Sequence, residues 1–349
     1  MKTFSVLLLF AATAFCDPIY TIANLGGLGG STATGYAVND SGTVVGWGQA
    51  ASGGQQAFVS TSSGVKALPL GVGTESYAYG INDAGTVVGN TYVNGQSHGT
   101  VWSAGGPTDL GANTYAVAIN SAGAVVGSNN GNAFVARNGN VEDLILPQAM
   151  NWSAAYGIND VGTAVGDGRL ANGTFQSLVW NADGSVTSLG TLGGSSSQAM
   201  DVNNSGEVVG FASLTSGYQH AFSTVNGTMT DLGTLGGSSY AYGVNSGGEV
   251  VGYSWLNNGD QHAFLYYNGI MLDLNALLPA NSGWVVEQAF GINDAGQITG
   301  MGFYNGHEVA FLMTDPPPGP VAATPEPSTT LLMAAGLGFI ALLRPRRKR

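Results

Sequence analysis

The chain has 349 residues, of which 56 are glycine and only 9% are charged. This glycine content is too high for a helical protein and lacks the strict triplet period of collagen, so we expect an all-β protein. Residues 17–324 contain twenty acidic side chains and three basic ones, a net charge of −17. Such an acidic body, without a basic patch, excludes nucleic acid and anionic lipid as expected partners.

The first 16 residues are typical of a cleaved signal peptide. Lys2 gives a positive start, residues 6–12 form an apolar core, and Ala12-Thr13-Ala14 has the small-x-small pattern of a cleavage site. Lipid modification at Cys16 is the weaker alternative, because the bulky Phe15 precedes the cysteine. After cleavage Cys16 is the only thiol, so packing and hydrogen bonds must hold the exported fold without an intramolecular disulfide.

A short pattern, Asn-Asp-x-Gly-x-Val-Val-Gly or a close variant, returns seven times along the chain. Its anchoring asparagines are Asn39, Asn82, Asn120, Asn159, Asn203, Asn245 and Asn293. Successive anchors are 43, 38, 39, 44, 42 and 48 residues apart, so seven units of about 42 residues fill residues 17–314. Self-similarity at this period is the signature of a repeat architecture.

Each unit predicts four short strands. An apolar stretch precedes the anchoring Asn, the Asn-Asp-x-Gly segment has the composition of a tight turn, and Val-Val follows as a buried strand. A third strand carries His-Ala-Phe, complete at residues 220–222 and 262–264. The fourth leads into Asp-Leu-Gly-Thr-Leu-Gly-Gly at residues 231–237, with a near copy at 188–194.

These phrases resemble the extracellular HAF repeat family of bacteria, over roughly residues 19–314. The resemblance implies an extracellular location and a repeat architecture, and it brings no established activity. Four strands on a 40-to-45-residue period favour a seven-bladed β-propeller, with an open β-solenoid as the alternative. Because the last unit stops at Thr314 without a fourth strand, residues 22–30 are expected to supply that strand and close the ring.

Residues 315–327 form a Pro-rich linker that ends in the motif Pro325-Glu326-Pro327. An apolar segment within residues 328–349 follows, and after it come the basic residues Arg344, Arg346, Arg347, Lys348 and Arg349. These three parts resemble the PEP-CTERM sorting signal of Gram-negative bacteria. The resemblance implies an exosortase-type enzyme as partner, transient anchoring in the inner membrane through the apolar helix, and a final location at the cell surface or in the extracellular matrix.

No catalytic site is evident, and no cofactor is expected. His98, His220 and His262 occupy equivalent places in separate repeats, which favours a structural role over a metal site. Calcium is the one ion that the Asn-Asp-x-Gly turns suggest, but the turns lack the further carboxylates of a full calcium loop. No pair of carboxylates clearly breaks the repeat.

Trp152 and Trp284 are candidate ligand contacts, because each lies in a longer loop that replaces the Gly-rich turn. Packing in a gap between blades is the alternative, and it is the commoner role of such a tryptophan. We expect a non-catalytic exported surface or matrix protein that binds exopolysaccharide or another surface component. A secreted carbohydrate-active hydrolase or lyase, using a non-repeated carboxylate such as Glu287 or Asp167, is the alternative, and a calcium-stabilised adhesin is the third hypothesis.

Overall fold

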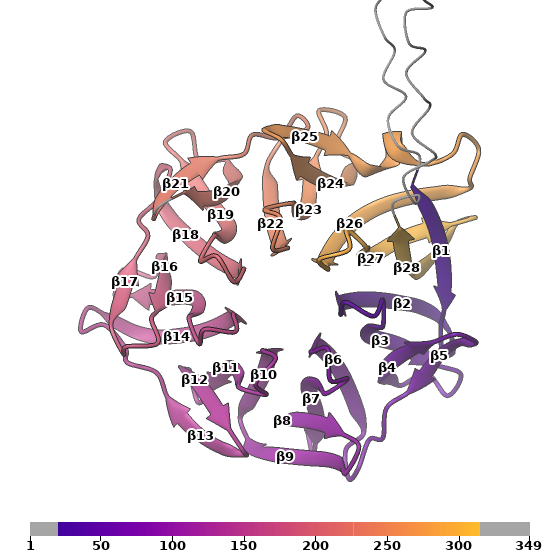
Figure 1. Cartoon of the computed structure of the whole chain (residues 1–349), viewed down its shortest axis with the longest axis horizontal. Coiled ribbons are helices and arrows are strands. Elements are labelled where there is room, and N and C mark those ends of the chain that lie inside the picture. Colours follow the sequence, from indigo (N-terminus) through magenta and orange to yellow (C-terminus); the bar gives the residue numbers. More distant parts are fainter. Residues whose placement is uncertain (1–19, 226, 315–349) are drawn as a thin grey trace, which may run out of the picture. The chain divides into compact units, whose positions relative to one another are not determined.

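The computed structural model describes residues 20–225 and 227–314. These residues form 28 strands in seven four-stranded antiparallel sheets, arranged as blades around a central channel (Figure 1). The predicted seven-bladed β-propeller is confirmed, and the open solenoid is wrong. The predicted signal peptide (1–16), linker (315–327) and C-terminal segment (328–349), with the sorting motif and basic cluster, lie outside the described residues.

In every blade the first strand of the repeat lies nearest the channel and the fourth lies at the periphery (Figure 1). Blade 1 comprises β2 (Gly29–Val38), β3 (Val44–Ala50), β4 (Gln55–Thr61) and β5 (Gly64–Ala67). Blade 2 comprises β6 (Glu75–Ile81), β7 (Val87–Val93), β8 (Gln96–Ser103) and β9 (Gly106–Ala112). Blade 3 comprises β10 (Thr114–Ile119), β11 (Val125–Asn129), β12 (Asn132–Arg137) and β13 (Asn140–Asp143). Blade 4 comprises β14 (Met150–Ile158), β15 (Ala164–Leu170), β16 (Phe175–Trp180) and β17 (Val186–Ser188).

The remaining blades follow the same order. Blade 5 comprises β18 (Gly193–Val202), β19 (Val208–Leu214), β20 (Gln219–Val225) and β21 (Thr228–Asp231). Blade 6 comprises β22 (Ser239–Val244), β23 (Val250–Trp255), β24 (Gln261–Tyr267) and β25 (Ile270–Asp273). Blade 7 comprises β26 (Trp284–Ile292), β27 (Ile298–Tyr304), β28 (His307–Thr314) and, from the other end of the chain, β1 (Thr21–Gly26).

The ring is closed by β1, which pairs antiparallel with β28, Thr21 opposite Thr314 and Ile22 opposite Met313. The phase of the repeat predicts this closure, but the strand ends four residues earlier than expected. Gly26 adopts a φ of 78°, and its N–H donates to the Asn24 side chain, which turns the chain out of the sheet. The expected end of this strand, Gly29 and Gly30, instead begins β2.

Packing between neighbouring blades makes up the core. The phenylalanine of the third strand, in His-Ala-Phe or in the looser copies Gln-Ala-Phe, Asn-Ala-Phe and Val-Ala-Phe, is fully buried at Phe58, Phe134, Phe222, Phe264 and Phe311. Each fully buried aromatic side chain contributes about 1.5–3 kcal/mol relative to an exposed one.

Blades 2 and 4 lack this phenylalanine and have Thr100 and Leu178 in its place. In these blades a buried tryptophan, Trp102 or Trp180, stands two residues later and fills the gap to the preceding blade. Each indole N–H donates to a backbone carbonyl 2.8 Å away, so its polar group is satisfied.

The expected longer loop after Asp273 contains a short 3-10 helix, η1 (Leu274–Leu277), whose first turn is capped by the Asp273 side chain. Within residues 20–225 and 227–314, no helix has the length and apolar character needed to span a bilayer. The predicted apolar segment of the sorting signal belongs to the undescribed C-terminal part.

Candidate functional site in the central channel

One end of the channel, here called the turn face, carries all seven Asn-Asp-x-Gly turns. The side-chain oxygen of each anchoring Asn accepts the backbone N–H four residues later, as the turn chemistry of the sequence predicts. Its Nδ2 also donates to the carbonyl of the next anchor, over 2.8–3.2 Å in all seven cases. The bond from Asn293 to Asn39 closes a ring that ties every blade to its neighbour.

The residue after each anchor adds a second, partial ring at the turn face. The N–H of Asp40 donates to Asp83, that of Ser121 to Asp160, and that of Asp160 to Asn204, each over 2.8–2.9 Å. Burial alone would raise the pKa of Asp160, but hydrogen bonds from Ser121 and Asn204 outweigh it and hold this pKa below its ordinary value. In the described part of the chain no three His, Cys, Asp or Glu side chains are grouped as metal ligands.

The channel wall is formed by one bulged residue from each innermost strand. In β2, for example, Gly35 pairs with Gly46 and Ala37 with Val45, so Tyr36 is the extra residue between them. The seven bulged residues are Tyr36, Tyr79, Val117, Tyr156, Met200, Tyr242 and Phe290. All seven line the channel cavity, which fits the tendency of bulges to re-aim side chains near functional sites.

The bulge also explains the glycine that closes Val-Val-Gly, or its variants Ala-Val-Gly and Ile-Thr-Gly, in every repeat. A Cβ on Gly89 would collide with the carbonyl oxygen of Tyr77, just before the bulge of β6. The same collision is found at Gly46, Gly127, Gly166, Gly210, Gly252 and Gly300. This glycine is required because the bulged strand approaches it too closely for any side chain.

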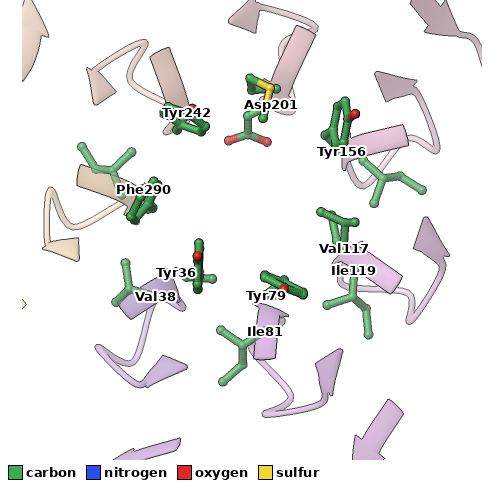
Figure 2. A pocket seen from close by; sticks show the side chains of 17 residues that line it. Tyr36, Val38, Tyr79, Ile81, Val117, Ile119, Tyr156, Asp201, Tyr242 and Phe290 are labelled. Carbon is green, nitrogen blue, oxygen red and sulfur yellow. The ribbon is translucent and has the colours of Figure 1, made fainter. Parts of the chain in front are cut away.

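The cavity behind this wall has a volume of about 330 Å³ and follows the propeller axis (Figure 2). Val38, Ile81 and Ile119 line both this cavity and the neighbouring one that the asparagine ring borders, so a level of aliphatic side chains lies between the cavity and the ring. A volume of this size lies at the lower end of the range for small-molecule sites.

Asp201 is the one carboxylate among the residues that line this cavity. It follows the bulged Met200 of β18, at a position where the other six blades carry only glycine or alanine. Its two oxygens accept the N–H groups of Val202 (2.8 Å) and Val244 (3.0 Å), and Figure 2 shows the carboxylate directed into the channel. Burial raises its pKa to about 6, although these two hydrogen bonds act in the opposite direction.

A second unusual carboxylate, Asp167, lies behind the wall on β15. It is fully buried, and the Gln198 amide of the next blade donates to it. Burial raises its pKa to about 7, which hydrogen bonds from Gln198 and Tyr156 offset only in part. Tyr156 and Asp201 line the channel here, and Asp167 and Gln198 lie behind them. These four residues of blades 4 and 5 are here called the polar arc.

The end of the channel opposite the turn face is here called the loop face. An almost continuous series of aromatic rings, here called the aromatic arc, lines the rest of the channel and its mouth at the loop face. Neighbouring ring centroids in it are 4.9–6.5 Å apart. Its members are Tyr36, Trp47, Tyr77, Tyr79, Tyr92, Phe211, Tyr240, Tyr242, Tyr253 and Phe290, all of them partly exposed. Partly exposed aromatic rings in mutual contact over this extent are a candidate binding surface.

The two predicted tryptophan contacts have different surroundings. Trp152 packs edge-on against Phe175 and lines a cavity with Tyr115, whose hydroxyl lies 3.5 Å from that of Tyr92 in the aromatic arc. Trp284 instead packs against Tyr304 and Phe311 at the edge of a core cluster. Trp152 therefore has the geometry of a ligand contact more than Trp284 does.

The repeated histidines lie away from the channel and pair with aspartates of the fourth strand. Nδ1 of His98, His220 and His262 lies 2.9, 2.9 and 2.7 Å from a carboxylate oxygen of the fourth strand of the same blade. Glu287, named as a possible catalytic carboxylate, is partly exposed on β26, and burial and the nearby Glu308 raise its pKa. It does not line the channel cavity.

Sequence reasoning finds the repeat but misses both the aromatic arc and Asp201. The signal for Asp201 was present, since an acidic residue replaces glycine or alanine at one place in seven. The acidic residue can be recognised as a candidate site residue only once the bulge in the strand shows that its position faces the channel.

Comparison with known proteins supports the sorting signal and the fold. Residues 323–348 match the PEP-CTERM protein-sorting motif, which directs exported proteins to the cell surface or the extracellular space after processing by an exosortase. None of the curated proteins compared with the chain shows significant sequence similarity to it.

The solved structures that are similar to this chain have low sequence identity to it. A puromycin-hydrolysing peptidase of Mycobacterium tuberculosis is 11% identical with a TM-score of 0.53, and the match covers 82% of this chain and 52% of the peptidase. TolB of Acinetobacter baumannii is 11% identical with a TM-score of 0.41, over 63% of this chain and 60% of TolB. A gluconolactonase of Xanthomonas campestris is 11% identical with a TM-score of 0.41, over 88% and 94%. At such identity the first of these similarities shows the fold alone.

Proposed function

We propose that the protein is a non-catalytic surface or matrix protein that binds extracellular polysaccharide at the loop-face mouth of its channel. The observation that carries this proposal is the aromatic arc, ten partly exposed rings in mutual contact around one channel. The sorting motif at residues 323–348 supports it, because that motif delivers the protein to the place where such polysaccharides are found.

The chemistry of the channel mouth fits a neutral sugar chain. The C–H faces of a pyranose ring pack on aromatic rings, while tyrosine hydroxyls bond to sugar hydroxyls. Asp201 in the polar arc offers a further hydrogen-bonding group opposite the rings. The net charge of −17 over residues 17–324 disfavours an anionic polymer.

Co-sedimentation of the purified protein with exopolysaccharide from the producing bacterium tests this function. We expect saturable binding that weakens roughly 3- to 10-fold in Tyr77→Ala and in Tyr240→Ala, since a lost stacking contact is worth about 0.5–1.5 kcal/mol. Tyr267→Ala is the matched control, because Tyr267 is 48% exposed and lies outside the channel. Equal binding by all three variants would contradict a site in the aromatic arc.

A carbohydrate-active hydrolase or lyase is the second candidate, and the polar arc is the observation that favours it. Asp167 and Asp201 both have raised pKa values, about 7 and about 6, as acid–base catalysis at neutral pH requires. Incubation with the same polysaccharide, followed by analysis of reducing ends, would reveal turnover. Turnover that disappears in Asp201→Asn would replace the binding function with this one.

A further inference from the structure

The inner part of the channel has features that polysaccharide binding at the mouth does not need. Aromatic side chains at the bulged positions of five blades surround the axis of the cavity, namely Tyr36, Tyr79, Tyr156, Tyr242 and Phe290 (Figure 2). Val117 and Met200 complete this level. The cavity is therefore a cage of electron-rich rings rather than a simple aliphatic pore.

The charge balance inside the cage is negative. The lining residues include one carboxylate, Asp201, and no basic side chain. The three basic residues in the described part of the chain, Lys66, Arg137 and Arg169, are exposed on other strands. Asp201 is thus held in place by two backbone N–H groups but is not neutralised by a cation of the protein.

A cation enclosed by aromatic faces gains from their negative quadrupole, and the gain increases when the site excludes water. Hard metal ions need several oxygen ligands, which one carboxylate does not provide. An alkylated ammonium group fits better, because its methyl groups contact the rings while its charge is balanced by the carboxylate.

We propose that the inner channel is a binding site for a small organic cation that carries a quaternary or N-alkylated ammonium group. Tyr36, Tyr79, Tyr156, Tyr242 and Phe290 form the cage, and Asp201 provides the counter-charge. The cavity of about 330 Å³ holds one such group with its substituents. The site shares Tyr36, Tyr79, Tyr242 and Phe290 with the aromatic arc, but it does not require polysaccharide to bind at the mouth.

Calorimetric titration of the purified protein with choline and with its uncharged isostere 3,3-dimethylbutan-1-ol, at pH 8, tests the proposal. The two ligands have the same shape, so their difference isolates the charge. We expect choline to bind roughly 10-fold more tightly than the isostere, as cation–π and carboxylate attraction in a partly desolvated cage predict. Equal affinities, or no binding of choline, would overturn the proposal.

Variants assign the effect to named side chains. Asp201→Asn should remove most of the preference for choline, whereas Asp260→Asn, an exposed carboxylate in a loop outside the channel, should keep it. Phe290→Leu retains an apolar side chain without the ring and should weaken choline more than the isostere. Thermal melting of each variant shows whether it is folded, and a folded Asp201→Asn with unchanged preference would refute the role of Asp201.

The pH dependence gives a test that needs no variant. The titratable groups facing or adjoining the cage are Asp201, its four tyrosines and, behind Tyr156, Asp167. Burial raises the pKa of the tyrosines, so they stay neutral, and the pKa of Asp201 is raised to about 6. The affinity for choline should fall as the pH is lowered through 6, whereas the affinity for the isostere should not change. If the affinities of both ligands change with pH in the same way, the proposed cage is contradicted.

Discussion

The closed asparagine ring predicts a large stability loss from a small substitution. Asn120→Ala removes the donor to the Asn159 carbonyl, 3.0 Å away, and the acceptor of the Ala124 N–H, 2.9 Å away. Both partners are buried backbone groups. Leaving a buried polar group unpaired costs about 1–3 kcal/mol, so the variant should lose roughly 2–5 kcal/mol of unfolding free energy.

The assay is thermal unfolding of the variant and of a matched control. Asn181 anchors a turn with the same backbone hydrogen bonds, through Gly184 and Ser185, but on the outer part of blade 4. Its Nδ2 bonds only to the side chain of Ser185, so Asn181→Ala should cost less than about 0.5 kcal/mol.

At about 2–4 °C per kcal/mol, the melting temperature of Asn120→Ala should fall by roughly 4–20 °C, and that of the control by about 2 °C or less. Asn293→Ala, which breaks the bond that joins the last blade to the first, should behave like Asn120→Ala. If Asn120→Ala and Asn181→Ala melt together, the ring contributes no stability between blades and the reasoning fails.

Two further predictions concern stability. The effect of Asp167→Asn on stability should depend on pH. The pKa of Asp167 is about 7 in the folded protein and 3.8 ordinarily, so the stabilisation by its protonated carboxyl is complete below pH 4. This stabilisation is lost as the pH rises towards 7, by about 4 kcal/mol at most. The variant should therefore melt higher than the wild type at pH 8 and close to it at pH 4, and a difference independent of pH would count against the burial argument. Deletion of residues 20–26 removes β1 together with the burial of Tyr20 and Ile22, so the unfolding free energy should fall by at least about 3 kcal/mol. The deletion also uncovers the edge of β28, through which the protein should aggregate. An unchanged melting curve would show that closure by β1 does not stabilise the ring.

The architecture could be predicted because each repeat carries its own strand and turn signals. The missing fourth strand after Thr314 and the extra strand at the start of the chain together imply closure, and the pairing of β1 with β28 confirms it. Turn chemistry identified the anchoring asparagines, but their bonds between blades could not be inferred. Those bonds depend on the blades being brought side by side around a ring, a relation between residues about 40 positions apart.

Blades 2 and 4, in which a tryptophan takes the place of the missing phenylalanine, also show what could not be predicted from the sequence. In the sequence, repeats 2 and 4 look like weak copies, because Thr100 and Leu178 replace the phenylalanine. In the fold, Trp102 and Trp180 reach the same interblade space from the next inward-facing position of the strand, since side chains alternate with a period of two. The tryptophan therefore fills the space between the blades that phenylalanine fills elsewhere, although the His-Ala-Phe pattern is lost.

The division between repeated and varied positions indicates where function should be sought. The glycine of Val-Val-Gly and the anchoring asparagine are the same in all seven blades, because the bulge and the ring of hydrogen bonds require them. The bulged residue, three positions before each anchoring asparagine, faces an open cavity and is under no such requirement, and it ranges from Val117 to Tyr242. Binding properties can therefore change at the bulged position, and at the position occupied by Asp201, without loss of the propeller. A ligand of this protein should accordingly respond to substitutions at these channel positions and be insensitive to the outer His–Asp pairs, however prominent those pairs are in the sequence.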